Sequence, residues 1–221
     1  MLKAVLFDMD GVIVDTEPLH KKAYFLMFNV FNIEVSEALY ESTTGQSTIN
    51  VCKKLCDVFK LEDKPETLMQ TKRDIFTKLF HSDPSLKLID GVLELIKNYY
   101  SNGLTLILAS SASMLTINNV FLRFKLDQYF KAKISGADLK ASKPHPEIFV
   151  RAAELSGFSR TQCFVIEDST NGIKAAKSAG IYCVGFNSFH SKNQDYSLAD
   201  LVIEDYSLIH YKKINKIFNA N

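Results

Sequence analysis

The sequence lacks several features that would assign it to a specialised class of protein. It has no apolar run approaching the ~18–20 residues of a membrane-spanning helix, and its first residues lack the charged start and cleavage pattern of a signal peptide. It also has little net charge, because 26 lysines and arginines oppose 25 aspartates and glutamates and leave a formal charge of +1. No broad basic field therefore favours nucleic acid. We expect a cytoplasmic monomer with no membrane or nucleic-acid partner.

Cysteine is scarce, and its spacing argues against the commonest thiol sites. The four cysteines (Cys52, Cys56, Cys163 and Cys183) include no CxxC pair. Cys52 and Cys56 are one helical turn apart among apolar residues, so we interpret the cysteines as small buried side chains rather than as a metal or redox site. Repeats and low-complexity segments are absent as well. The 221 residues, 47% of them hydrophobic, can form one large domain or a core with an insertion.

The most informative segment is an N-terminal apolar run that ends in two carboxylates, Asp8 and Asp10. Such a run is typical of a strand buried on both faces of a parallel sheet, and ligands gather at the carboxyl ends of these strands. Carboxylates this close repel each other unless a cation or a shared proton relieves the repulsion. Magnesium uses one or two carboxylates and keeps positions open for substrate phosphate. The alternative is a plain strand followed by an Asp-Gly turn.

The rest of the chain has two parts with different periodicity. Helical spacing dominates the first part and predicts helices over residues 17–32, 36–43, 47–59 and 65–81, with no convincing strand. In the second part, helices over 91–101, 113–123, 146–156 and 171–179 alternate with strands at 104–109, near 132–134, and at 163–166, 181–185 and 201–203.

This alternation predicts an α/β fold with a doubly wound, Rossmann-like parallel sheet. Residues 1–15 and 86–221 would form this core, and residues 16–85 would form an inserted, all-helical cap subdomain. We expect the insertion to lie over Asp8 and Asp10, where a lid excludes water and selects substrates. An extra layer of packing helices is the alternative.

Two further strand ends carry a hydroxyl group and a lysine. Ser110 and Ser111 follow the strand at 104–109, where hydroxyl and backbone N–H groups suit an anion. The alternative for Ser110 is an ordinary helix N-cap. Lys143 stands in a segment that two prolines stiffen, and it could neutralise both an aspartate and a phosphate. Most single lysines, however, are simply solvated.

Another strand end mirrors the first. The apolar run at 163–166 ends in Glu167 and Asp168, which could complete an oxygen shell for a cation held by Asp8 and Asp10. Ser169, the next residue, is placed to cap the following helix. Taken alone, this segment fits a capped turn as well as a metal site.

Together these motifs resemble those of the haloacid dehalogenase superfamily. Asp8-Met9-Asp10-Gly11 matches its first motif, Ser110 its second, Lys143 in K-P-x-P its third, and Glu167-Asp168 its fourth. The resemblance covers essentially the whole chain, and the helical insertion falls where this superfamily has its small α-helical cap. Within the superfamily, the sequence is most similar to the β-phosphoglucomutase-like branch, which includes many sugar-phosphate phosphatases.

The resemblance implies phosphoryl transfer with Mg²⁺ as the cofactor and a small phosphorylated metabolite as the substrate. It implies that Asp8 is the nucleophile, which forms an aspartyl-phosphate, and that Asp10 is the general acid and base. Ser110 and Lys143 would bind the oxygens of the transferring group. The implied magnesium ligands are Asp8, the backbone carbonyl of Asp10, and Asp168, with Glu167 supporting directly or through water.

The resemblance leaves two reactions open. We favour a phosphatase acting on a metabolite such as a sugar phosphate, and the alternative is a β-phosphoglucomutase that interconverts β-glucose 1-phosphate and glucose 6-phosphate. His20 and Lys72 fall where the mutase has a hinge histidine and a cap lysine, although both also fit ordinary surface roles. Thr48 stands where the mutase carries an arginine, and loss of a guanidinium from a phosphate site is not conservative. Ala112 and Ser113 replace a Ser-Lys pair. A non-catalytic phospho-ligand binding protein is a remote alternative, because no motif residue is missing.

The substrate-binding candidates that the resemblance implies are Thr16, His20, Gly45, Gln46, Ser47, Lys72 and Ser111. Of these, Gly45, Gln46 and Ser47 are expected on a cap loop that discriminates between substrates. The Tyr- and Lys-rich end of the chain is interpreted as a solvated helix, with a partner surface as the alternative. That interpretation covers Tyr206, Tyr211, Lys212, Lys213 and Lys216.

Overall fold

The computed structural model describes residues 1–43, 48–188 and 193–220, and the chain divides into two compact units. One unit contains Met1–Asp15 and Lys87–Asn221, and the other contains Thr16–Leu86. We call them the sheet unit and the helical unit. No helix in the described ranges combines the length and hydropathy needed to cross a membrane.

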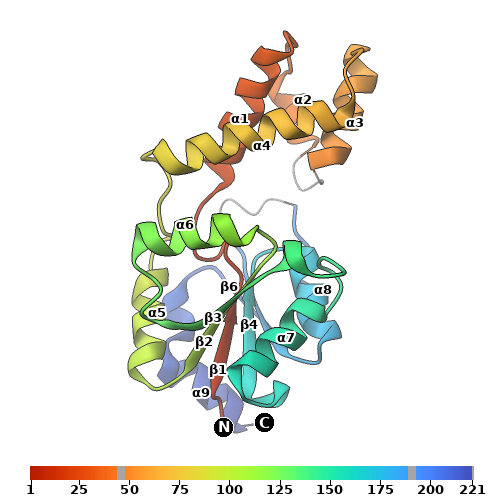
Figure 1. The fold of residues 1–221 in the computed structure, drawn as a ribbon. Helices are drawn as coiled ribbons and strands as arrows, with labels where there is room; N and C mark the ends of the chain where they lie inside the picture. The colour runs from red at the N-terminus through yellow and green to blue at the C-terminus, as the bar shows by residue number, and fades with distance from the viewer. Residues whose placement is uncertain (44–47, 189–192, 221) are drawn as a thin grey trace. The chain divides into compact units, whose positions relative to one another are not determined.

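The sheet unit is built on a six-stranded sheet with the order β3-β2-β1-β4-β5-β6 (Figure 1). The strands are β1 (Ala4–Phe7), β2 (Thr105–Ser110), β3 (Phe130–Ser135), β4 (Cys163–Glu167), β5 (Tyr182–Phe186) and β6 (Leu201–Ile203). Each neighbouring pair of these strands is parallel. The predicted α/β class with a doubly wound parallel sheet is confirmed.

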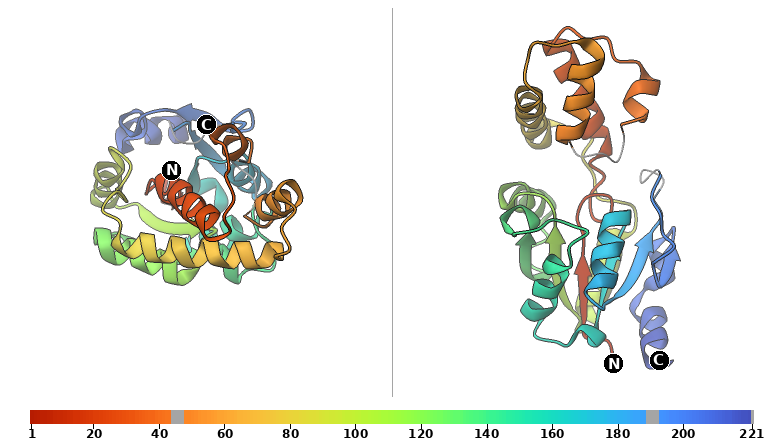
Figure 2. Two further views of the ribbon diagram at one scale, coloured as in Figure 1. Left: turned by 90° about the horizontal axis from the view of Figure 1, so that it is seen from above. Right: turned by 90° about the vertical axis from the view of Figure 1, so that its right-hand side faces the viewer.

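Helices cover both faces of this sheet, as Figure 2 shows. They are α5 (Val92–Ser101), α6 (Met114–Phe124), α7 (Glu147–Ser156), α8 (Thr170–Ser178) and α9 (Tyr211–Ala220), with short 3₁₀ segments at Gly136–Asp138, Arg160–Gln162 and Tyr206–Ile209. Side chains alternate between the faces along a strand. Leu6 therefore joins the core under α7 and α8, whereas Phe7 packs on Tyr99 of α5 on the other face.

The edge strand β3 is longer than the strand predicted near residues 132–134. It runs from Phe130 to Ser135, and the exposed Lys131 interrupts its apolar pattern. A lysine on an edge strand is common, because its charge discourages pairing with another chain. The central strand β1 was easier to predict, since all four of its residues are buried.

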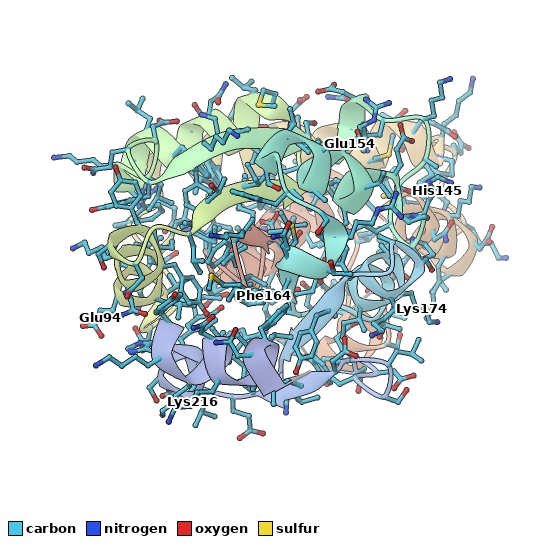
Figure 3. The ribbon with its side chains drawn as sticks, turned by 90° about the horizontal axis from the view of Figure 1, so that it is seen from below. Glu94, His145, Glu154, Phe164, Lys174 and Lys216 are labelled. Carbon is cyan, nitrogen blue, oxygen red and sulfur yellow. The ribbon has the colours of Figure 1, made fainter. Side chains whose placement is uncertain are left out.

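The C-terminal helix α9 is not a solvated element, so the prediction for this end of the chain was wrong. Ile214 is fully buried, and the ring of Phe218 lies 5.9 Å from that of Phe164 in β4. Figure 3 shows Phe164 in the interior and Lys216 on the outer side of α9. Tyr206 is also buried, and its hydroxyl donates to the Val12 carbonyl at 2.6 Å. The described residues of this end thus include buried as well as exposed side chains.

The helical unit consists of α1 (Glu17–Val30), α2 (Glu37–Glu41), α3 (Thr48–Phe59) and α4 (Pro65–Ser82), and its described residues form no strand. Helix α4 packs against α1 and α3. The core of this unit includes Met27, Phe28, Leu55, Leu68 and the buried Cys52. Helix α1 ends two residues before its predicted end at residue 32, because Asn32 adopts a left-handed conformation with φ of 51°.

Two chain segments of the sheet unit, residues 13–15 and 87–89, are hydrogen-bonded side by side. The amide of Asp15 donates to the Lys87 carbonyl at 3.2 Å, and the amide of Ile89 donates to the Ile13 carbonyl at 3.0 Å. Val14 and Leu88 form an antiparallel bridge between them. The point where the chain leaves the sheet unit therefore lies beside the point where it returns.

Candidate active site

The candidate site lies at the carboxyl end of β1, in the middle of the sheet. The register pairs Phe7 with Leu108 of β2 and with Ile166 of β4, so Asp8 stands level with Ala109 and Glu167. The Asp8 amide donates to the Ile166 carbonyl at 3.0 Å, which continues the strand pairing by one residue. Polar groups from three adjacent strands are thus brought to one edge, where parallel sheets bind ligands.

Lys143 occupies the centre of this edge. Its ammonium donates to Asp8 Oδ1 at 2.5 Å, to Glu167 Oε1 at 2.7 Å and to the Ala109 carbonyl at 3.1 Å. Its side chain is only 6% exposed, so all three of its donors are used inside the protein. The structure therefore brings Asp8, Lys143 and Glu167 together, although 135 residues separate Lys143 from Asp8.

The electrostatics of the group are dominated by burial and by crowded carboxylates. Burial raises the pKa of Asp8 well above its ordinary value; Lys143 opposes this, and the charges of Glu167, Asp168 and Asp10 raise it further. For Lys143, burial alone would lower the pKa, but Asp8 and Glu167 outweigh it and raise the pKa above the usual lysine value. Negative charge in this group exceeds what one lysine neutralises.

Glu167 is fixed on both of its oxygens. Lys143 donates to Oε1, while the amide and the hydroxyl of Ser169 both donate to Oε2 at 2.9 Å. The same Ser169 hydroxyl accepts from the Gly172 amide at 3.1 Å and caps α8, as the sequence predicts. A Cβ at Gly172 would lie 1.7 Å from Glu167 Oε1, so no larger residue fits there. Glu167 therefore binds Lys143 through one oxygen and Ser169 through the other. The role of Glu167 as a metal ligand stays a prediction.

The Asp-Gly turn after β1 brings a further carboxylate close. The amides of Ile13 and Val14 donate to the Met9 carbonyl at 2.7 and 3.0 Å, which closes a tight turn. Gly11 within it has φ of 80°, and a Cβ there would lie 2.0 Å from Asp168 Oδ2. Glycine at this position therefore serves two needs, the left-handed backbone and the approach of Asp168.

The donor groups at this edge fit a magnesium ion. Asp8, Asp168 and the backbone carbonyl of Asp10 are hard oxygen donors, and Mg²⁺ takes one or two carboxylates while retaining waters and substrate oxygens. In the described parts of the chain, no three His, Cys, Asp or Glu side chains form a ready-made cluster of the kind that encloses a metal. The magnesium site therefore stays a prediction that rests on the chemistry of these oxygen donors.

The second motif lies at the carboxyl end of β2, whose last residue is Ser110. Ser110 is fully buried, and its Oγ accepts from the Ala112 amide at 3.0 Å. Ser111 is exposed. The N-cap of α6 is Ser113, whose side chain accepts from the Thr116 amide at 3.3 Å. Ser110 is therefore not the helix cap, and that alternative was wrong.

His20 and Lys72 form a buried pair inside the helical unit. Lys72 is 3% exposed, and its Nζ lies 2.7 Å from His20 Nδ1 and 4.9 Å from the ring centroids of Tyr24 and Phe76. The His20 ring stacks on Phe76 with centroids 4.3 Å apart. The alternative that Lys72 is an ordinary surface lysine was wrong.

The protonation state of His20 follows from these contacts. Burial, and then the charge of Lys72, lower the pKa of His20 to about 3. The ring is therefore neutral near pH 7. Because the Lys72 ammonium can only donate, Nδ1 accepts and the ring proton lies on Nε2.

The remaining predicted substrate residues belong to the same unit or lie outside the described ranges. Thr16 is buried directly before α1, and its side chain does not cap that helix. Gly45, Gln46 and Ser47 lie outside the described residues. The substrate roles of Thr16, His20 and Lys72 stay predictions.

Sequence reasoning missed Gln194 and Tyr196, whose side chains bind the loop that carries Asp168. They lie within residues 193–200, which form no helix or strand, and are more than 20 residues from the loop that carries Asp168. Neither periodicity nor a motif marked them.

Several known proteins are similar to this chain over most of its length. Residues 5–186 match the family model described as haloacid dehalogenase-like hydrolase. A phosphorylated carbohydrates phosphatase from Thermotoga maritima is 30% identical over 203 residues, which cover 90% of this chain and 91% of that protein. The fructose-1-phosphate phosphatase YqaB from Escherichia coli is 28% identical, with 81% of this chain and 94% of that protein covered. A crystal structure of β-phosphoglucomutase from Clostridium difficile superimposes with a TM-score of 0.76 at 25% identity, covering 100% of this chain and 98% of that one.

Proposed function

The chain belongs to the haloacid dehalogenase-like hydrolase family, and on that premise we propose that it is a Mg²⁺-dependent phosphatase of a small phosphorylated metabolite, such as a sugar phosphate. One observation carries the proposal: the buried Lys143 ammonium binds both Asp8 and Glu167 at the carboxyl edge of the sheet. In this proposal Asp8 supplies the nucleophilic carboxylate, and Lys143 supplies a fixed positive charge for the phosphoryl group.

In the first step of the proposed reaction, a carboxylate oxygen of Asp8 attacks phosphorus. The bond from phosphorus to the leaving oxygen breaks, and the carboxyl group of Asp10 gives its proton to that oxygen. The product alcohol leaves, and the phosphoryl group remains on Asp8. Asp10 suits this role because it lies two residues from Asp8, at the same strand end.

In the second step, the carboxylate of Asp10 takes a proton from water, and that water attacks phosphorus. The bond to Asp8 breaks, inorganic phosphate forms, and both aspartates return to their starting states. Lys143, and Ser110 through its hydroxyl group, would stabilise the charge on the phosphoryl oxygens during both steps. When bound by Asp8, Asp168 and the Asp10 carbonyl, Mg²⁺ supplies further positive charge that offsets the phosphate.

The names of the relatives support a sugar phosphate as the substrate class, since the two phosphatases are named for phosphorylated carbohydrates and fructose 1-phosphate. We assign substrate selection to the helical unit, as a cap, with Gly45, Gln46 and Ser47 as the discriminating loop. The mutase alternative draws on the match to β-phosphoglucomutase and on the buried pair of His20 and Lys72. Thr48, in place of the mutase's arginine, opposes it. A cytoplasmic monomer remains our prediction for its state in the cell.

The test is phosphate release from a panel of hexose and pentose phosphates with Mg²⁺. It is run beside a coupled assay that converts β-glucose 1-phosphate to glucose 6-phosphate in the presence of the bisphosphate. We expect free phosphate, and we expect Asp8→Asn to lower kcat by at least about 10³-fold, because the amide is not a nucleophile.

The matched control is Asp127→Asn, which makes the same chemical change at an exposed carboxylate that pairs with Lys133 at 2.6 Å. This variant should retain wild-type turnover. Rapid isomerisation with little phosphate release would make the protein a mutase. Undiminished release by Asp8→Asn would exclude the aspartyl-phosphate route.

A further inference from the structure

The loop that carries Asp168 is held from one side by a segment that follows β5. The hydroxyl of Tyr196 lies 2.9 Å from the Asp168 backbone carbonyl, to which it donates, and 3.3 Å from the Phe186 carbonyl. Its hydrogen bond therefore ties the residue after β4 to the end of β5.

Two neighbours of Tyr196 bind the next part of the same loop. Gln194 Oε1 accepts from the Thr170 amide at 2.8 Å, at the start of α8. The Asp195 amide donates to Thr170 Oγ1 at 2.7 Å. Three consecutive residues thus make three hydrogen bonds to the stretch from Asp168 to Thr170.

The Tyr196 ring is itself anchored to the sheet. A Cβ at Gly185 in β5 would lie 2.9 Å from Tyr196 Cδ1 and 3.1 Å from the Ala199 side chain, so glycine leaves the room that the ring occupies. The ring packs against the core cluster under α7 and α8. The hydroxyl is consequently presented from a rigid support and not from a mobile side chain.

Asp168 is contacted from two sides. Gly11 lies against its carboxylate, and Tyr196 holds its carbonyl. We propose that Gln194, Asp195 and Tyr196 position Asp168 for the metal, with the Tyr196 hydroxyl as the main positioning group. This inference rests on the proposed function, because it concerns the same metal site. Partners that orient a ligand in this way commonly change metal affinity by about 10- to 100-fold when they are removed.

The experiment measures binding of Mn²⁺, a paramagnetic substitute for Mg²⁺, by electron paramagnetic resonance in the absence of substrate. Tyr196→Phe removes the hydroxyl and keeps the ring, and we expect Mn²⁺ affinity to fall about tenfold. In turnover, the Mg²⁺ concentration for half-maximal rate should rise by a similar factor, while kcat at saturating Mg²⁺ stays within about twofold of the wild type. If Tyr196 only stabilised the fold, its loss would not raise the Mg²⁺ requirement while leaving kcat at saturating Mg²⁺ nearly unchanged.

Tyr99→Phe is the matched control. Tyr99 is a fully buried tyrosine of the same unit, and its hydroxyl also donates to a backbone carbonyl, that of Ile209, at 2.6 Å. We expect this variant to melt at a lower temperature and to bind Mn²⁺ like the wild type.

Asp168→Asn separates failure of the inference from failure of the proposed function. If the wild type binds Mn²⁺, Asp168→Asn binds it weakly and Tyr196→Phe binds it as tightly as the wild type, the positioning role is overturned and the metal site stands. If Asp168→Asn binds Mn²⁺ like the wild type, the metal assignment itself fails. Equal losses of affinity in Tyr99→Phe and Tyr196→Phe would also overturn the inference.

Discussion

Single glycines decide how closely the acidic groups of the site can approach one another. Gly11 combines a left-handed backbone with contact to the Asp168 carboxylate, and Gly172 leaves room for Glu167. An added methyl group at either position would displace a carboxylate and leave the rest of the core unchanged. The positions of the Asp168 and Glu167 carboxylates are thus sensitive to a single added methyl group at Gly11 or Gly172.

We therefore expect Gly11→Ala to lower kcat/KM by about 10²-fold, since displacements near 1 Å in a catalytic group have effects of this size. The matched control is Gly103→Ala, because Gly103 has φ of 76° and no heavy atom within 4 Å of an added Cβ. Each variant should lose about 1–2 kcal/mol of unfolding free energy from the left-handed backbone, measured by urea denaturation.

Only Gly11→Ala should lose activity. Equal kcat/KM in the two variants would show that the contact of Gly11 with Asp168 is unimportant for turnover.

The candidate site residues could be picked out of the sequence one by one, whereas the residues that support them could not. Asp8, Ser110, Lys143 and Asp168 each occupy a strand end or a short motif. Tyr196, by contrast, lies 28 residues from Asp168, in an irregular segment. Contacts of this kind depend on tertiary packing and have no local sequence signal.

At the scale of helices and strands, the elements that could be predicted from the sequence are those whose buried residues are also the apolar ones. Strand β1 and strand β4 are continuous apolar runs buried on both faces, and their residue types alone indicate this. The lysines of helix α9 predict a solvated element, but Ile214 and Phe218, one helical turn apart, lie against the rest of the sheet unit. That spacing marks the face that packs on the sheet.

The pair of helices α1 and α4 contains a titratable contact between His20 and Lys72. The pKa of His20 is about 3 in the folded protein, below the ~6.5 of an unfolded chain. The unfolded state therefore binds more protons between these values, so stability is fully present above pH 6.5 and falls as the pH drops toward 3. Between pH 7 and pH 5 we expect a loss of about 1–2 kcal/mol from this group.

Urea unfolding of the wild type and of His20→Gln at pH 7 and pH 5 checks this expectation. The variant should lose less stability on acidification than the wild type does. An unchanged pH dependence in His20→Gln would contradict the depressed pKa.

At the scale of the whole molecule, the chain consists of a sheet unit and a helical unit with separate cores. The alternation of strands and helices after residue 90, against helices alone before it, made this organisation visible in the sequence. Specificity could not be predicted to the same depth, because it depends on pocket shape and closure.

We expect the sheet unit to fold without the helical unit when a short Gly-Ser linker replaces residues 17–85. The two chain segments that it would join are already hydrogen-bonded, from Asp15 to Lys87 and through the bridge of Val14 with Leu88. Circular dichroism should show cooperative melting, and Mn²⁺ affinity should stay within a few-fold of that of the full chain, which serves as the control. A product that melts without cooperativity would show that the sheet unit needs the insertion.

The antiparallel bridge between Val14 and Leu88 also bears on how such a protein can diversify over evolutionary time. Because the exit and the return of the chain are neighbours, a helical segment can lengthen, shrink or be exchanged between lineages without moving β1 or β2. If the proposed function holds, selection can alter the preference for the organic part of a substrate in the helical unit and leave the phosphate chemistry of the sheet unit unchanged. The short bridge between Val14 and Leu88 is thus an insertion point at which helical segments of different length and sequence can be joined to the sheet unit.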